Sequence, residues 1–196
     1  MIVARTFVKP GNVVWDLGSN QGIFATCASH MAGPSGRVFA VEPDPKYAAM
    51  QQRTFDALPT DRCAPTQVLA AAISDRVSIQ TFNISAKGHT TSHLAKHSIG
   101  SPFVSTKTVP TFPLDFLLDY WPAPNFIKVD VEGAVLDMIA GGPRMFSEVR
   151  PTLYIEIDPP DQPALIAKGY SLLKMARDGS LTKPAMPMAE LIAVPD

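Results

Sequence analysis

The sequence has little cysteine and no long apolar run. Its two cysteines, Cys27 and Cys63, are too far apart for a close metal-binding pair, so we expect reduced thiols in a cytoplasmic protein. Uninterrupted apolar runs are far shorter than the roughly 18 residues that a membrane-spanning helix needs. Residues 1–11 carry too short an apolar core for a signal peptide. We therefore expect no membrane span.

The sequence also lacks an excess of either charge. Its 17 basic and 18 acidic residues give a formal net charge of -1, and no block of like charges interrupts the chain. A nucleic acid or an anionic membrane surface is therefore not expected as a partner. The 196 residues, 46% of them hydrophobic, suffice for one globular domain spanning 1–196 with a substantial core.

Strand-like and helix-like segments alternate along the chain, which predicts an α/β fold with a mostly parallel, twisted sheet and helices on both faces. The last two strand-like segments, 170–177 and 190–196, predict an antiparallel pair at the C-terminal edge of that sheet. The polar stretch 86–113 predicts a long loop with little regular structure. The other expected strands are 12–19, 36–43, 65–74, 77–85, 125–133 and 152–158, and the expected helices are 21–31, 44–58, 114–121, 134–142 and 162–169.

The turn DLGSNQG (16–22) joins the first expected strand to the first expected helix. A dinucleotide-binding turn would read G-x-G-x-x-G, and its middle glycine lets the backbone approach a pyrophosphate. Asn20 takes the place of that glycine here, and no Gly-Lys-Ser/Thr follows to make a P-loop. The alternative is that Gly18 and Gly22 only permit a tight turn between a strand and a helix.

Glu42 ends the second expected strand, about twenty residues after Gly22. A carboxylate at this position can accept hydrogen bonds from both hydroxyls of a ribose. Asp16, just before the turn, adds a negative charge that suits a cationic or amino-bearing ligand. S-adenosylmethionine has a ribose, a sulfonium and an ammonium but no pyrophosphate, so we expect it as the ligand.

The segment IKVDVEG contains charges that alternate with apolar residues. Lys128, Asp130 and Glu132 are expected on one face near the carboxyl end of a strand, where open α/β sheets bind ligands. The next expected strand repeats the pattern with Glu156 and Asp158. The alternative is a solvated edge strand with paired lysine and glutamate. It fits less well, because the intervening valines and isoleucines predict a buried opposite face.

Five segments together resemble the FkbM-type methyltransferases: VVWDLGSNQG, VFAVEPDP, AAISD, IKVDVEGAVLDMIAGG and RPTLYIEI. The resemblance extends from Pro10 to about Tyr170, and the IKVDVEG block is its most specific part. It implies a Rossmann-like class I methyltransferase fold and transfer of a methyl group from S-adenosylmethionine, leaving S-adenosylhomocysteine. The implied acceptor is a small molecule, through a hydroxyl of a sugar, a glycolipid or a polyketide-type compound.

The resemblance also implies roles for individual residues. Asp130 would lie nearest the reacting methyl group and contact the cofactor, and either Asp130 or Glu132 would take the hydroxyl proton. Lys128 and His89 are the further catalytic candidates. The remaining cofactor-binding candidates lie in the turn, at the end of the second expected strand, and in a third segment, 72–74, whose backbone would line the adenine. They are Asp16, Gly18, Ser19, Asn20, Gly22, Glu42, Pro43, Ala72, Ile73 and Ser74.

His89, His93 and His97 recur at intervals of four residues. Two such histidines on one helix could share a metal ion, but the surrounding glycine, serine and threonine residues favour a loop. A general base for the acceptor hydroxyl and plain loop histidines are the other interpretations. Asp130 and Glu156 could hold Mg2+ and chelate a diol acceptor, but the resemblance does not require this and no metal is expected.

The start of the chain departs from the family pattern. Family members usually carry helical segments before the first motif, whereas only about ten residues precede it here. We expect an open acceptor site, a cap supplied by a partner, or a truncated chain, and an exposed apolar edge would favour a homodimer. The alternative function is a non-catalytic or partner-dependent subunit that only binds S-adenosylmethionine.

Overall fold

The structure is a computed structural model that describes residues 1–85, 92–97 and 103–196. The strands are β1 (Val13–Leu17), β2 (Arg37–Val41), β3 (Thr66–Leu69), β4 (Ala72–Ile73), β5 (Ser78–Ser85), β6 (His93–Leu94), β7 (Phe103–Phe112), β8 (Phe126–Val129), β9 (Thr152–Glu156), β10 (Tyr170–Met175), β11 (Leu181–Thr182) and β12 (Glu190–Pro195). The helices are α1 (Ile2–Phe7), α2 (Ile23–Ala32), α3 (Pro45–Asp56), α4 (Leu114–Leu118), α5 (Val135–Ala140) and α6 (Gln162–Ile166), with the short turns η2 (Ala95–His97), η3 (Met145–Val149) and η4 (Pro159–Asp161).

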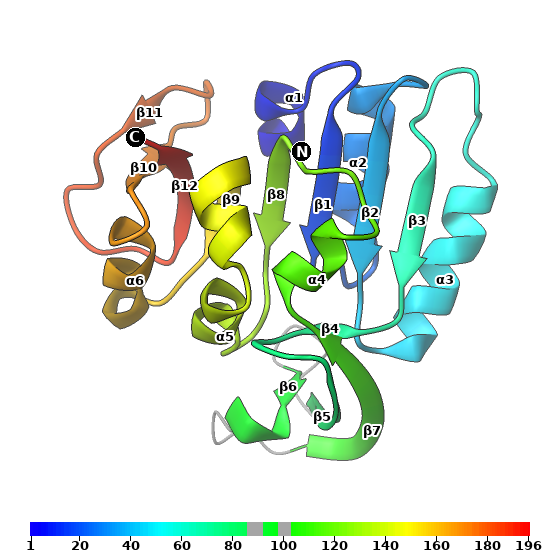
Figure 1. Ribbon diagram of the computed structural model, residues 1–196. Helices are drawn as coiled ribbons and strands as arrows, with labels where there is room; N and C mark the ends of the chain where they lie inside the picture. Colours follow the sequence, from blue (N-terminus) through cyan, green and yellow to red (C-terminus); the bar gives the residue numbers. More distant parts are fainter. Residues whose placement is uncertain (86–91, 98–102) are drawn as a thin grey trace.

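The large sheet has eight strands in the order β11-β10-β12-β9-β8-β1-β2-β3 (Figure 1). Strands β3, β2, β1, β8 and β9 run parallel. Strand β12 is antiparallel to both of its neighbours, β9 and β10. The dinucleotide-binding order 3-2-1-4-5-6 has no such inserted strand. The predicted α/β fold with a mostly parallel sheet and an antiparallel C-terminal pair is confirmed.

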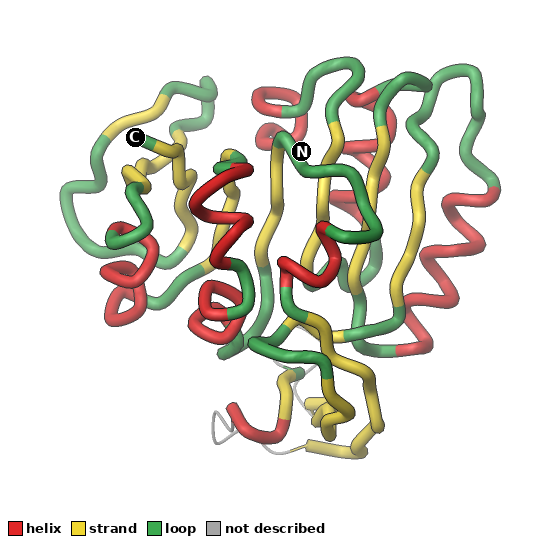
Figure 2. Tube along the Cα trace, in the orientation of Figure 1, coloured by secondary structure: helices red, strands yellow, loops and turns green. Residues whose placement is uncertain are grey.

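Helices cover both faces of the large sheet, as the alternation of side chains along its strands requires (Figure 2). Val14 of β1 and Phe126 of β8 pack with α1 and α2. Their chain neighbours Trp15 and Ile127 point the other way and pack with α4, α5 and η3. Helix α3 begins one residue after the start of the expected helix 44–58, and the Asp44 carboxylate caps it by accepting a hydrogen bond of 2.9 Å from a backbone N–H of the first turn.

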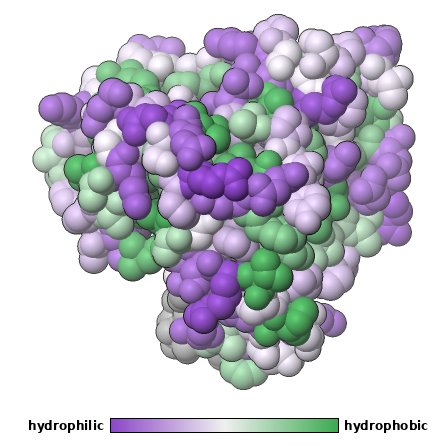
Figure 3. All heavy atoms as spheres, in the orientation of Figure 1, coloured by the Kyte–Doolittle hydropathy of each residue, from purple (hydrophilic) through white to green (hydrophobic). Residues whose placement is uncertain are grey.

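A second sheet of four strands, in the order β4-β7-β5-β6, forms a small lobe beside the carboxyl ends of the large sheet (Figures 1 and 3). The prediction of a loop over 86–113 is wrong where the structure describes it, because β7 pairs with β5 along nearly its whole length. The strand expected over 65–74 is likewise two strands, since β3 belongs to the large sheet and β4 to the small one. The lobe therefore brings residues of β5 and β6 against the body.

No helix within the described ranges is both long enough and apolar enough to span a membrane.

Candidate functional site

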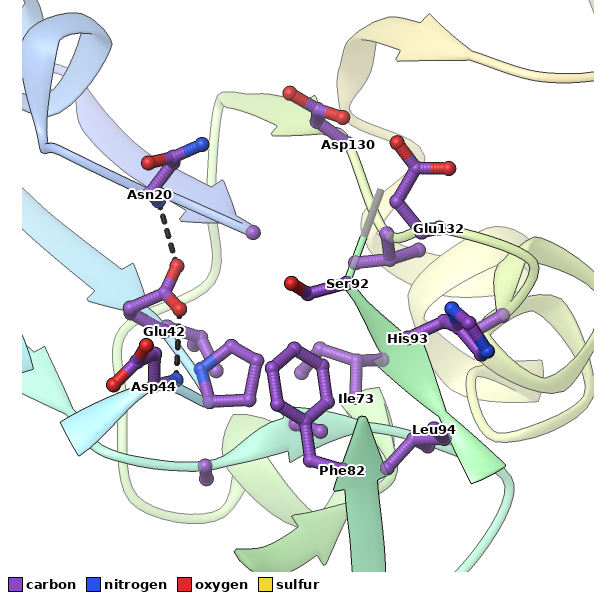
Figure 4. Close-up of a pocket in the computed structure, with 17 residues that line it drawn as sticks. Asn20, Glu42, Asp44, Ile73, Phe82, Ser92, His93, Leu94, Asp130 and Glu132 are labelled. Carbon is purple, nitrogen blue, oxygen red and sulfur yellow. Dashed lines mark hydrogen bonds between the residues drawn. The ribbon is translucent and has the colours of Figure 1, made fainter. Parts of the chain in front are cut away.

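A pocket of about 670 Å³ opens where β1, β2 and β8 end, and the small sheet forms its opposite wall (Figure 4). Asp130 and Glu132, which follow β8, lie at one side of it. The predicted cofactor residues in the lining are Gly18, Asn20, Glu42, Pro43, Ala72 and Ile73. The topology thus brings together predicted residues from four separate sequence segments.

The turn between β1 and α2 depends on two glycines with left-handed backbone, Gly18 at φ +73° and Gly22 at φ +75°. A Cβ on Gly18 would collide with the carbonyl oxygen of Asp130, because the chain after β8 passes directly against the turn. Asn20 is also left-handed, at φ 50°. Its side-chain Oδ1 is buried and accepts no hydrogen bond from the described residues.

Gln51 of α3 stabilises this turn through hydrogen bonds, and it was not among the residues predicted from the sequence. Its side chain is completely buried. The Ser19 hydroxyl donates to Gln51 Oε1 over 3.0 Å, and Gln51 Nε2 donates to the carbonyl oxygen of Asn20 over 2.6 Å. A Cβ on Gly22 would lie 2.8 Å from Gln51 Cγ. Predicted Ser19 and Gly22 thus support the shape of the turn from behind the pocket lining.

Glu42 is 6% exposed and reaches the pocket from the end of β2. One carboxylate oxygen accepts from the backbone N–H of Asn20 over 2.7 Å, and the other accepts from that of Asp44 over 2.8 Å (Figure 4). Burial raises the pKa of Glu42 from 4.5 to about 7, although both backbone donors favour the ionised form. Each oxygen retains a lone pair that can accept a further hydrogen bond.

Lys128 links the glycine turn after β1 to the segment that follows β8. Its Nζ donates to the carbonyl oxygen of Gly18 over 2.8 Å and to Asp130 Oδ2 over 3.0 Å. It also pairs with the fully buried Asp16, 3.5 Å away. Burial alone would lower the pKa of Lys128, but the two carboxylates outweigh it and raise that pKa. The ammonium stays charged, so its contacts are those of a positioning group rather than a base.

A second pocket of about 390 Å³ adjoins the first and shares residues 130–132 with it. It lies beyond the carboxyl ends of β8 and β9. No lysine or arginine of the described ranges lines it. Its acidic lining residues are Asp130, Glu132, Glu156, Asp158 and Asp161.

Glu132 is the most strongly shifted carboxyl group at this boundary. Burial and then the charges of Glu156, Asp130 and Asp158 raise its pKa to about 7. Within the described residues, no group of three histidine, cysteine, aspartate or glutamate side chains is arranged to hold a metal ion.

The small sheet contributes lining residues, and those at 92–94 belong to the stretch that was predicted to be a loop. Phe82 of β5 and Leu94 of β6 present apolar surface to the pocket, and Ser92 and His93 lie beside them (Figure 4). His93 is 2% exposed. Among the other predicted residues, Ser74 is fully buried and lies behind the lining, and His89 lies outside the described residues.

The fold and the site define a class of protein. A parallel sheet with one inserted antiparallel strand, a left-handed glycine turn after β1 and a carboxylate after β2 together indicate a Rossmann-like, class I methyltransferase that uses S-adenosylmethionine. The chain belongs to the FkbM methyltransferase family, whose domain model, Methyltransferase FkbM domain, matches residues 16–172.

Several known proteins are similar to this chain in sequence or in fold. The chain is similar to the hexuronic acid methyltransferase AglP of Haloferax volcanii, with 29% identity over 182 residues that cover 85% of this chain and 67% of that protein. A crystal structure of an FkbM methyltransferase from Methylobacillus flagellatus matches 93% of this chain with a TM-score of 0.57 and 16% identity. This chain spans 43% of that structure's length. Aeropyrum pernix fibrillarin, solved with S-adenosylmethionine bound, matches 98% of this chain and 74% of its own length at a TM-score of 0.54 and 14% identity.

Proposed function

We propose that this chain transfers the methyl group of S-adenosylmethionine to a hydroxyl oxygen of an uncharged, sugar-like acceptor. The observation that carries the proposal is the pair of adjoining pockets, which meet at Asp130 and Glu132. The first has the groups that the cofactor needs. The second is open to an acceptor and is lined by carboxylates.

The residues of the first pocket fit the cofactor. Glu42 retains acceptor capacity for the ribose hydroxyls. The unpartnered Oδ1 of Asn20 suits the ammonium of the methionine part, because a buried acceptor gains most from a charged donor. Ile73, Phe82 and Leu94 provide apolar walls for the adenine. The turn itself disfavours a pyrophosphate, because Asn20 stands where a dinucleotide-binding turn has its middle glycine.

Residues of the chain then position the acceptor site and remove the proton of the acceptor hydroxyl. The bound cofactor supplies an electrophilic methyl group. Lys128 holds Asp130 against the glycine turn, which fixes the boundary between the two pockets. Glu132, with a pKa near 7, accepts the proton that the acceptor hydroxyl loses, since a base whose pKa lies near the working pH transfers protons most effectively.

The charge of the second pocket selects the acceptor class. The name of AglP specifies a hexuronic acid, which carries its own carboxylate. Five carboxylates line the second pocket of this chain, and like charges brought together in a site disfavour binding by several kcal/mol. Neutral hydroxyls instead donate hydrogen bonds to carboxylates. These features support a neutral polyol over a uronate.

Methyl transfer from radiolabelled S-adenosylmethionine to matched acceptors tests the proposal. The acceptors are a panel of hexosides and the hexuronic acids that correspond to them. We expect labelled methyl ethers, which resist mild alkali, from the neutral sugars. Alkali-labile methyl esters formed on the uronic acids would contradict the acceptor assignment. Binding of S-adenosylhomocysteine with no transfer to any acceptor would support the partner-dependent subunit instead.

A further inference from the structure

Strand β6 provides pocket lining although it is short and lies at the edge of the small sheet. Ser92, His93 and Leu94 are consecutive lining residues. The strand pairs with β5 at two positions, Phe82 with Leu94 and Asn83 with His93. So few ladder pairs do not hold an edge strand in one place in water. The position of this wall therefore depends on side-chain contacts.

Side-chain contacts of the described residues also bind β6 to its own sheet. The Ser92 hydroxyl oxygen accepts a hydrogen bond of 3.0 Å from the backbone N–H of Ser85. Leu94 packs into an apolar cluster with Phe82 and Ile84. Both contacts stay inside the small lobe, so they do not fix the distance between this wall and the large sheet across the pocket.

Among the described residues, Lys96 makes a contact that crosses to the body, through Asp137. Lys96 lies on η2, directly after β6, and 32% of its side chain is exposed. Its Nζ donates to the hydroxyl oxygen of Ser74 over 2.9 Å and pairs with Asp75 at 3.5 Å. It also pairs with Asp137, which lies on α5, the helix that follows the Asp130–Glu132 segment and covers the large sheet.

We propose that Lys96 is a positioning residue for the cofactor pocket, and that it holds the wall formed by 92–94 at its working distance from the body. The ligand named in its test rests on the proposed function. The two carboxylates lie near the surface, with 28% and 24% of their side chains exposed, and water can solvate them when the ammonium is removed. Loss of Lys96 therefore releases the wall while the rest of the fold is retained.

The test compares Lys96→Met with Arg76→Met. Arg76 is a matched control, because it also pairs with Asp75, at 3.2 Å, and is exposed, whereas the ion pair to Asp137 within the described part of the chain comes from Lys96. Calorimetry gives the Kd for S-adenosylhomocysteine, and hydrogen exchange of the ligand-free protein reports on amides 92–97. We expect Lys96→Met to raise that Kd about tenfold, because apparent affinity falls with the fraction of molecules that keep the wall in place.

Three further results belong to the expected pattern. Amides 92–97 exchange faster in Lys96→Met, while the exchange of amides in β1 and β8 does not change. Lys96→Arg restores most of the affinity for S-adenosylhomocysteine. Arg76→Met has the same affinity and the same exchange as wild type. Unchanged exchange at 92–97, or an equal effect of Arg76→Met, would overturn the role of Lys96. Failure of the wild type to bind S-adenosylhomocysteine would refute the proposed function, while the exchange measurement would still decide on Lys96. If Lys96→Met does not fold, Asp137→Asn removes the same pair from the other side.

Discussion

Glu132 is surrounded by other carboxylates, and their charges tune its chemistry at the scale of a single residue. Burial together with Glu156, Asp130 and Asp158 raises the pKa of Glu132 to about 7. A carboxyl group with its ordinary pKa is a weak base at neutral pH, whereas this one is matched to a hydroxyl that must lose its proton. Asp130 differs from Glu132 in having a cationic partner, since one of its carboxylate oxygens accepts a hydrogen bond from Lys128.

Glu132→Gln tests the assignment of the base. The amide keeps the shape and polarity of the side chain but cannot accept the proton. We expect kcat to fall by roughly 10²–10⁴, the range for loss of a general base, while the calorimetric affinity for S-adenosylhomocysteine stays near the wild-type value. Unchanged turnover would exclude Glu132 as the base and direct attention to the histidines of 89–97.

The pH profile of turnover provides the control for this assignment. Wild-type kcat should rise with pH and level off above about 7, because Glu132 must be ionised to act. Glu156→Gln removes one of the charges that raise this pKa, so the midpoint should move to lower pH while turnover at the plateau is retained. A midpoint that does not move would show that another group controls the profile.

Several site residues could be predicted from the sequence because their roles follow from local rules. Gly18 and Gly22 mark a left-handed turn, and Glu42 directly follows a buried strand. Gln51 could not be predicted in this way. Its hydrogen bonds reach a turn about thirty residues away, and nothing in the sequence around α3 distinguishes it from a solvent-facing glutamine.

At the scale of elements, α3 and the turn after β1 form one unit through Gln51. Gln51→Leu keeps the volume of the side chain but leaves the Asn20 carbonyl without its donor, and the Ser19 hydroxyl keeps only the longer contact of 3.3 Å to the carbonyl oxygen of Val41. Leaving buried polar groups unpaired costs about 1–3 kcal/mol, so we expect a decrease of that order in the free energy of unfolding measured with urea. Affinity for S-adenosylhomocysteine should fall as well, because the turn carries Asn20.

The neighbouring glutamine provides the control for this element. Gln52 is exposed and its amide donates to Asp56 within the same helix, over 2.7 Å. Gln52→Leu should therefore change the free energy of unfolding by a few tenths of a kcal/mol, as surface substitutions usually do. Equal effects of the two substitutions would mean that the decrease comes from the helix itself rather than from the turn.

The small sheet shows where prediction of elements from sequence fails. Exposed β7 residues such as Thr106 and Thr108 are polar, and polarity without clear alternation suggests a loop. They are nevertheless β-branched and suit a strand whose side chains face water. Their partner strand, β5, ends at Ser85, well before β7 begins at Phe103. The pairing that creates the pocket wall is therefore non-local, and the sequence between the two strands has no clear hydrophobic periodicity that would predict it. The large sheet was predictable because its strands are buried and apolar.

At the scale of the whole molecule, burial of Glu42 links folding stability to pH. Its pKa is about 7 in the folded chain and 4.5 for the ordinary group, so between these values the folded chain keeps a proton that the unfolded chain has lost. The contribution of Glu42 to stability is therefore fully present below about pH 4.5 and decreases as the pH rises through 7. A shift of this size corresponds to roughly 3 kcal/mol at most.

Glu42→Gln isolates this contribution, because glutamine does not titrate. We expect the free energy of unfolding of the ligand-free wild type, measured with urea, to decrease more between about pH 5 and about pH 8 than that of Glu42→Gln. The variant loses one acceptor for a backbone N–H, so it starts lower at acid pH, and the difference between the two proteins should narrow as the pH rises. Glu148→Gln changes an exposed carboxylate on η3 and should follow the wild-type curve. A difference between wild type and Glu42→Gln that is constant with pH would show that Glu42 is already ionised in the folded chain, held by the backbone N–H groups of Asn20 and Asp44.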